Sequence, residues 1–102
     1  MTADLELVVI VVQHKDEKKV VDAVLGAGAG GVTYFYGQGT GVRQRLGFLG
    51  NFIQAEKVVL LTAVSSAKTA AVLAAATQAA ALDKPGHGFA CVLKITQALG
   101  LV

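Results

Sequence analysis

Residues 5 to 13 read Leu-Glu-Leu-Val-Val-Ile-Val-Val-Gln, and this stretch decides the fold. Successive side chains of a β-strand point to opposite faces of the sheet. Both faces are apolar in the centre of this stretch: one carries Leu7, Val9 and Val11, and the other carries Val8, Ile10 and Val12. The stretch therefore predicts a strand that is covered on both sides.

Two helices are expected beyond this strand. Asp16 is placed to cap the first helix, whose apolar positions recur at helical spacing and which glycines end: Val20, Val21, Val24, Leu25, then Gly26 and Gly28. Ser65 or Ser66 is placed to cap the second helix, which covers Ala67 to Leu82 and ends at the Lys84-Pro85-Gly86 turn.

Three further strands are expected, over Val32 to Tyr36, Lys57 to Val64 and Phe89 to Ile95. The order strand, helix, strand, strand, helix, strand is that of the ferredoxin-like βαββαβ sandwich. This α+β fold has a four-stranded antiparallel sheet with both helices on one face, because its crossovers are right-handed. Residues 1–102 are expected to form one such domain.

Composition excludes several classes of protein. The chain has 102 residues, of which 54% are hydrophobic and 16% are charged, yet its longest apolar runs are far too short to cross a bilayer. The early residues Asp4 and Glu6 do not fit a secretory signal, so we expect a cytoplasmic protein. The net charge is only +2 without a block of like charge, so nucleic-acid binding is not expected. The single Cys91 lies in an apolar stretch and is expected to be a small buried side chain.

The apolar strands also predict an assembly. The fold supplies helices for one face of the sheet, while all four predicted strands carry apolar residues on both faces. An exposed apolar patch of this size is avoided by soluble monomers. Burying ~500 Å² of it at ~25 cal/mol per Å² contributes ~12 kcal/mol before association costs. We therefore expect an oligomer packed through its sheets.

Two glycine-rich segments are candidates for a ligand site. Gly37-Gln38-Gly39-Thr40-Gly41 leaves a predicted strand and enters the long loop from Gln38 to Ala55. Alternate glycines let a ligand approach the backbone and expose successive N–H groups to an anion. Arg43 and Arg45 follow and could supply charge to phosphate or carboxylate. The alternative is a hinge with solvated arginines.

The second segment is Pro85-Gly86-His87-Gly88, just before the last predicted strand. His87 is a candidate contact for an anion, and the alternative is an exposed histidine in a turn. A third segment, Gly26 to Gly31, matches the dinucleotide-binding pattern in its letters but follows a helix, so it indicates a helix end and a tight turn.

Neither a catalytic nor a metal site is expected. The seven carboxylates fall at strand edges, helix ends and turns without a pair for acid and base work. His14, His87 and Cys91 lack a compact metal-ligand spacing. An enzyme is therefore not expected.

The motifs together resemble the PII signal-transduction family, and its divergent PII-like branch in particular. The residues that carry the resemblance are Ala29 to Thr33, Gly37 to Gly41, the strand Lys57 to Leu61, and the segment Asp83 to Leu93 with the pattern D-x-P-G-x-G-x-A-x-V-L. The resemblance implies a homotrimer with its sheets inward and with adenine nucleotides (ADP, AMP or ATP) between subunits. It also implies that residues 38–55 form the T-loop that contacts a protein target, a transporter or an enzyme, and that residues 83–88 form the B-loop.

The chain departs from the family pattern at several positions. The T-loop-like segment has no tyrosine, and Gly41 and Val42 stand where the family has Gln and Lys ligands. His87 and Phe89 replace the B-loop Asp and Lys, and Gly100 and Val102 fall where the family has C-terminal arginines. The cations left to meet a small anionic metabolite are Arg43, Arg45 and His87. Two alternatives remain open: a CutA-like metal-linked trimer, and a structural interaction module without a ligand.

Overall fold

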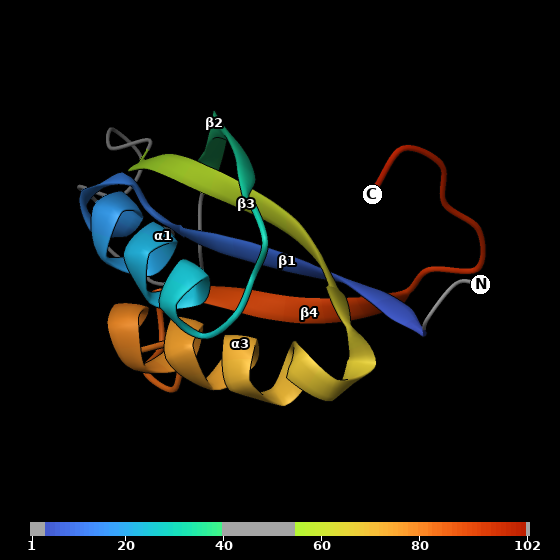
Figure 1. The fold of residues 1–102 in the computed structure, drawn as a ribbon. Helices are drawn as coiled ribbons and strands as arrows, with labels where there is room; N and C mark the ends of the chain where they lie inside the picture. Colours follow the sequence, from blue (N-terminus) through green and yellow to red (C-terminus); the bar gives the residue numbers. More distant parts are fainter. Residues whose placement is uncertain (1–3, 40–54, 102) are drawn as a thin grey trace.

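The computed structural model describes residues 4–39 and 55–101. The elements are β1 (Leu5–Gln13), the 3-10 turn η1 (His14–Asp16), α1 (Glu17–Gly26), β2 (Thr33–Gly39), β3 (Ala55–Ser65), α3 (Ser66–Ala80) and β4 (Gly88–Lys94). The strands form an antiparallel sheet in the order β2-β3-β1-β4, and α1 and α3 lie side by side against one of its faces (Figure 1). The predicted ferredoxin-like α+β sandwich is confirmed.

The core lies between the sheet and the two helices. β1 pairs with β3 and β4, so that Ile10 stands between Leu60 and Ala90. The even-numbered side chains of β1 and β3 face the helices and are almost entirely buried, together with apolar side chains of α1 and α3: Val8, Ile10, Val12, Val58, Leu60, Val64, Val20, Val24, Val72, Ala76 and Ala80. This core fixes both helices on the same face.

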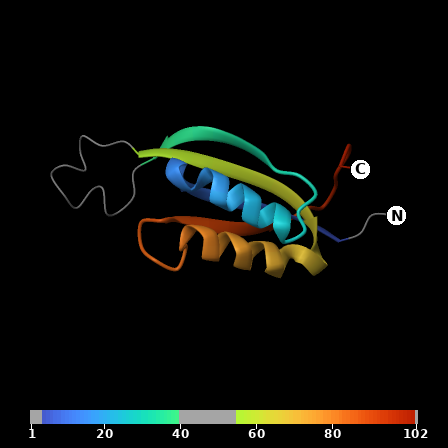
Figure 2. The same ribbon diagram turned by 60° about the vertical axis from the view of Figure 1, so that its left-hand side comes forward.

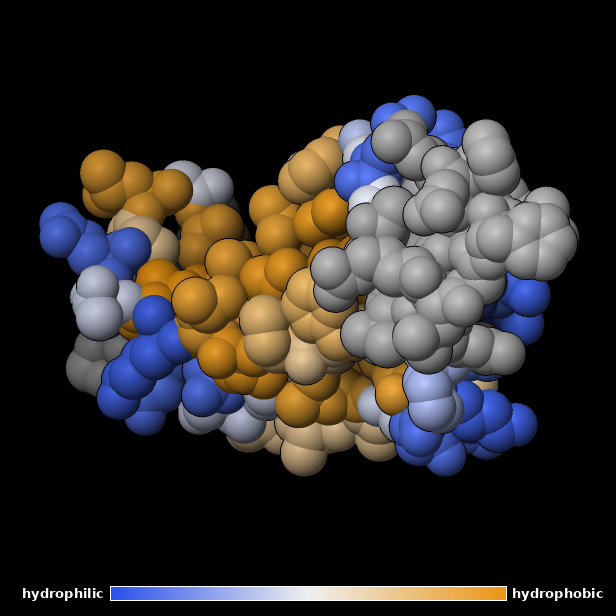
Figure 3. All heavy atoms as spheres, turned by 180° about the vertical axis from the view of Figure 1, so that it is seen from behind, coloured by the Kyte–Doolittle hydropathy of each residue, from blue (hydrophilic) through white to orange (hydrophobic). Residues whose placement is uncertain are grey.

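The opposite face of the sheet, which we call the open face, has no helix over it. Its side chains include Phe35 of β2, Val9 of β1, and Phe89 and Leu93 of β4, as the strand register requires. Phe35, Phe89 and Leu93 are 50%, 55% and 50% exposed. The view from behind in Figure 3 shows apolar side chains gathered over this part of the molecule.

Three expectations about capping and helix length need correction. Asp16 occupies the N-cap position of α1, but its buried carboxylate makes no capping bond and instead lies 3.5 Å from Lys19 Nζ. Ser65 also precedes α3 without a side-chain cap, while the N–H of the first helical residue, Ser66, donates to the Asp4 carbonyl (2.9 Å). α3 ends at Ala80 rather than Leu82, because Ala81 adopts a left-handed conformation (φ 53°).

Two apolar residues are more exposed than the sequence predicts. Cys91 was expected to be buried, but it is exposed on the open face, opposite Val9. Leu25 is 43% exposed at the end of α1, although it shares the helical spacing of the buried valines. The prediction for Cys91 was wrong because it rested on apolar neighbours in sequence, whereas burial depends on which face the helices cover.

The turn after α1 agrees with its predicted role. Gly28 has φ +114°, a conformation that side chains rarely adopt, and the Ala29 N–H donates to the Val24 carbonyl (3.1 Å). The glycine-rich stretch from Gly26 to Gly31 therefore ends a helix rather than opening one, as expected.

Candidate functional site

The first glycine segment is a strand, not a turn, over the residues that the structure describes. Gly37, Gln38 and Gly39 belong to β2 and pair with Lys57, Glu56 and Ala55 of β3. The expected start of the loop at Gln38 was wrong, because pairing with β3 holds Gly37 to Gly39 in the ladder, where Gly39 does not have a positive φ. Their backbone groups point along the sheet rather than converging on one point.

The rest of this segment lies outside the described residues. Thr40, Gly41, Arg43 and Arg45 fall in residues 40–54, so the predicted arginine contacts stay predictions. The predicted loop from Gln38 to Ala55 is shorter at both ends than expected, since Gln38 and Gly39 complete β2 and Ala55 begins β3. The paired ends of β2 and β3 are the base from which the chain leaves the sheet.

The second glycine segment forms a turn, as the sequence predicts. Gly86 has φ +82° and Gly88, the first residue of β4, has φ +137°. A Cβ atom at Gly88 would collide with the carbonyl oxygen of Val11 in the neighbouring strand. Gly88 is therefore required by the sheet itself, whatever it contacts in a ligand.

The turn is held to the central strand by a side chain that the sequence analysis missed. Gln13 ends β1, and its Nε2 donates to the Gly86 carbonyl (3.1 Å). This bond spans 73 positions in the chain, so only the strand register could have revealed it. Half-buried His87 follows Gly86 directly, so Gln13 positions the backbone on which His87 stands.

The two glycine segments lie at the same end of the sheet but on opposite edges. β2 ends, and β4 begins, at the end of the sheet where β1 has its carboxyl end. Figure 2 shows the turn between α3 and β4 at that end of the molecule. β3 and β1 separate the two edge strands. Three strand spacings of about 4.8 Å put the two segments about 14 Å apart within one chain.

A polar cluster that sequence reasoning also missed lies at this end. His14 Nε2 is 3.6 Å from Glu17 Oε1, and its Nδ1 is 3.5 Å from Glu56 Oε1. The Tyr36 ring stands edge-on to His14, with ring centroids 5.1 Å apart. A hydrogen bond to Glu17 raises the pKa of Tyr36, with smaller contributions from desolvation and nearby acidic groups. The cluster joins the start of α1 to the base of β2 and β3.

The cluster does not make a metal centre. Among residues 4–39 and 55–101, no group of three His, Cys, Asp or Glu side chains is arranged to hold a metal ion. Within the same residues, no helix has the length and apolar character needed to span a membrane. What the described part of the site offers chemically is backbone N–H groups, the His87 imidazole and the polar base of β2 and β3.

Comparisons with known proteins agree with this architecture. The crystal structure of Arabidopsis thaliana PII bound to citrate matches with a TM-score of 0.75, covering 97% of this chain and 84% of that one. The two sequences are 20% identical, so the match shows a shared fold. A search of curated proteins found no match. The family model described as nitrogen regulatory protein P-II matches residues 5–100, and the chain therefore belongs to the nitrogen regulatory protein P-II family.

Proposed function

We propose that this chain is a cytoplasmic, trimeric P-II sensor that binds a small anionic metabolite between subunits. P-II proteins are regulatory signalling proteins rather than enzymes. The metabolite class that we propose is an adenine nucleotide, ADP, AMP or ATP. Binding is reported to a protein target, a transporter or an enzyme, through residues 38–55.

The observation that carries this proposal is the position of the two glycine segments. They lie at one end of the sheet but on its opposite edges, about 14 Å apart by strand spacing. At this separation, the two glycine segments of a single chain cannot both contact one small anion. In the trimer that we propose, the β2 edge of one copy lies beside the β4 edge of the next. The site is then complete only between two chains.

The open face supports the trimer. Phe35, Phe89 and Leu93 are each about half exposed, although the other face of β4 packs against the core through Ala90 and Val92. Covering ~500 Å² of this face contributes ~12 kcal/mol before association costs. Three sheets packed together would remove the apolar face from water without any further element.

His87 and the two arginines that follow β2, rather than the acidic cluster around His14, support an anionic ligand in this proposal. His87 stands beside Gly86, whose carbonyl is fixed by Gln13, so the turn is pre-organised rather than loose. Arg43 and Arg45 follow β2 in sequence and supply the remaining positive charge in this proposal. The related Arabidopsis PII was crystallised with citrate, which is itself a small anion.

Signalling through residues 38–55 follows from where that segment joins the sheet. Its ends are Gln38–Gly39 and Ala55–Glu56, which pair with each other in the β2–β3 ladder. In this proposal, a ligand bound beside the paired ends of β2 and β3 contacts residues 38–55 better in one conformation of the segment than in another. Binding therefore raises the population of the conformation that the ligand prefers. The change in population alters docking of the protein target.

Calorimetry with ADP, AMP, ATP and citrate tests the proposal. We expect at least one of the nucleotides to bind, and Arg43→Ala to weaken that binding at least tenfold, which is the usual cost of one lost charge-assisted contact. Lys18→Ala is the matched control, because it also removes one positive charge but lies on the exposed side of α1. If no nucleotide binds to a well-folded trimer, the nucleotide assignment is wrong. If Arg43→Ala and Lys18→Ala bind alike, Arg43 is not a ligand contact.

A further inference from the structure

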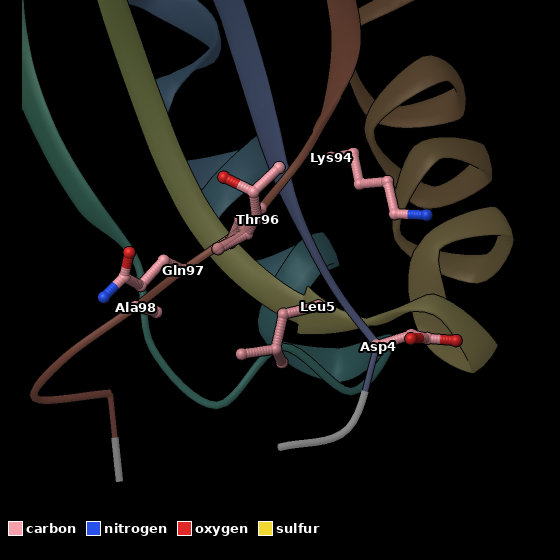
Figure 4. A pocket seen from close by; sticks show the side chains of 7 residues that line it. Asp4, Leu5, Lys94, Thr96, Gln97 and Ala98 are labelled. Carbon is pink, nitrogen blue, oxygen red and sulfur yellow. The ribbon is translucent and has the colours of Figure 1, made fainter.

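The far end of the sheet carries a hollow that the proposed nucleotide site does not use. It measures about 440 Å³ and is lined by Asp4, Leu5 and residues 94–98. It lies where β1 begins and β4 ends, opposite the end that carries the glycine segments. Figure 4 shows Leu5 beneath the chain that runs from Thr96 to Ala98, while the charged ends of Asp4 and Lys94 point away toward α3.

The chain that follows β4 begins in a fixed position. The Ile95 N–H donates to the Leu5 carbonyl (3.1 Å), which ties the start of the segment 96–101, here called the tail, to β1. Gly100 has φ +82°, a left-handed bend that favours glycine. Figure 3 shows the tail standing apart from the rest of the molecule, with a notch between them.

The tail presents leucine side chains to solvent. Leu99 is 92% exposed, the highest value among the large hydrophobic residues that the structure describes, and Leu101 is 52% exposed. Leu99 does not fill the hollow of its own chain, since the lining ends at Ala98. The hollow has room for an aliphatic side chain, because deleting one from a protein core leaves a void of about 150 Å³.

A hollow with Leu5, Ile95 and Ala98 in its lining and an unburied leucine on the same chain can supply the two halves of a head-to-tail contact. A cyclic trimer is built from such heterologous contacts, in which two different patches of the same chain meet across each interface. The hollow adjoins the open face, where Leu7 of β1 and Leu93 of β4 pair next to it. A contact made there is continuous with the packing of the sheets.

We propose that Leu99 of one copy inserts into the hollow of the next copy and locks the trimer at this end. The occupant is a second copy of this chain, and the inference rests on the trimer of the proposed function. Burying one leucine side chain corresponds to a roughly tenfold to hundredfold change in a dissociation constant. Leu99→Ser therefore raises the trimer dissociation constant at least tenfold, whereas Ala74→Ser on the exposed side of α3 leaves it unchanged.

Cross-linking tests the contact directly. Leu5→Cys and Leu99→Cys are combined in a chain whose native thiol is removed by Cys91→Ser, and the protein is oxidised and run on a non-reducing gel. We expect covalent dimers and trimers. The control pair, Leu5→Cys with Ala74→Cys, gives monomers. Sedimentation of the reduced protein is measured in parallel.

The outcomes separate this inference from the proposed function. A trimer that gives no inter-chain cross-link overturns the Leu99 contact and leaves the sensor proposal standing. A cross-link within one chain, seen as a monomer band without free thiol, also overturns it. A reduced protein that sediments as a monomer, with the parent behaving likewise, overturns the trimer and the inference together.

Discussion

Gly88→Ala is the substitution whose effect the structure predicts most sharply. Gly88 has φ +137°, and a Cβ there would collide with the Val11 carbonyl oxygen and come within 3.2 Å of the Val11 carbonyl carbon and 3.1 Å of the Val12 Cα. These are backbone atoms of β1, so they cannot rotate aside. A residue held in a disfavoured conformation costs about 1–3 kcal/mol, and overpacking adds about 1–3 kcal/mol. We therefore expect Gly88→Ala to lower the free energy of unfolding by about 3 kcal/mol or more.

Urea denaturation followed by circular dichroism measures this loss. Gly37→Ala is the matched control, because a Cβ at Gly37 meets no atom within 4 Å and its φ lies outside the left-handed region. The control should stay within about 0.5 kcal/mol of the parent. A Gly88→Ala protein as stable as Gly37→Ala would refute the reasoning. A valine at position 88 would also disturb the sheet, so a loss of ligand binding in Gly88→Val would not show that Gly88 contacts the ligand. Gly39→Val is the better test of ligand binding, because a Cβ at Gly39 makes only ordinary contacts with the Lys57 side chain.

Two further substitutions and one thiol reaction test other parts of the structure. Phe35→Asp places a charge on the open face and should dissociate the proposed trimer, so a variant that sediments as a trimer at micromolar concentration would contradict sheet-to-sheet packing. Thr69→Val removes the hydroxyl that donates to Glu6 Oε1 (2.5 Å) and should cost about 1–3 kcal/mol in a urea melt, whereas exposed Lys68→Ala should cost less than about 0.5 kcal/mol. If the open face is covered in the proposed trimer, the Cys91 thiol should react with a thiol reagent far more slowly in the native protein than in urea, and equal rates would show that this face is not covered.

The sequence predicts the fold well because hydrophobic alternation and helix spacing are strong signals. The nine residues of β1 have the bounds that their pattern indicates, Leu5–Gln13. β2 runs three residues past its predicted end, because pairing with β3 keeps Gly37 to Gly39 in the ladder despite their low strand propensity. Local propensity alone cannot show which neighbour a strand will find.

The candidate site is harder to predict, because it depends on contacts between distant positions. Gln13 and Gly86 meet through the strand register, and His14 reaches Glu56 across the same sheet end. Neither pair has a local sequence signal. Cys91 shows the same limit, since apolar neighbours along the chain do not reveal which face of a strand a helix covers. The proposed ligand site needs residues of a second chain, and no local pattern in one sequence shows which residues of two chains meet.

The site that we propose holds a small anion between two chains, at the end of the sheet that carries the glycine segments. A crystal structure of the protein grown with ADP tests it most directly. We expect a trimer with the nucleotide between Gly37–Gly39 of one copy and Gly86–Gly88 of its neighbour, with His87 at the phosphates. A nucleotide bound by one chain alone, or at another surface of the trimer, would contradict it.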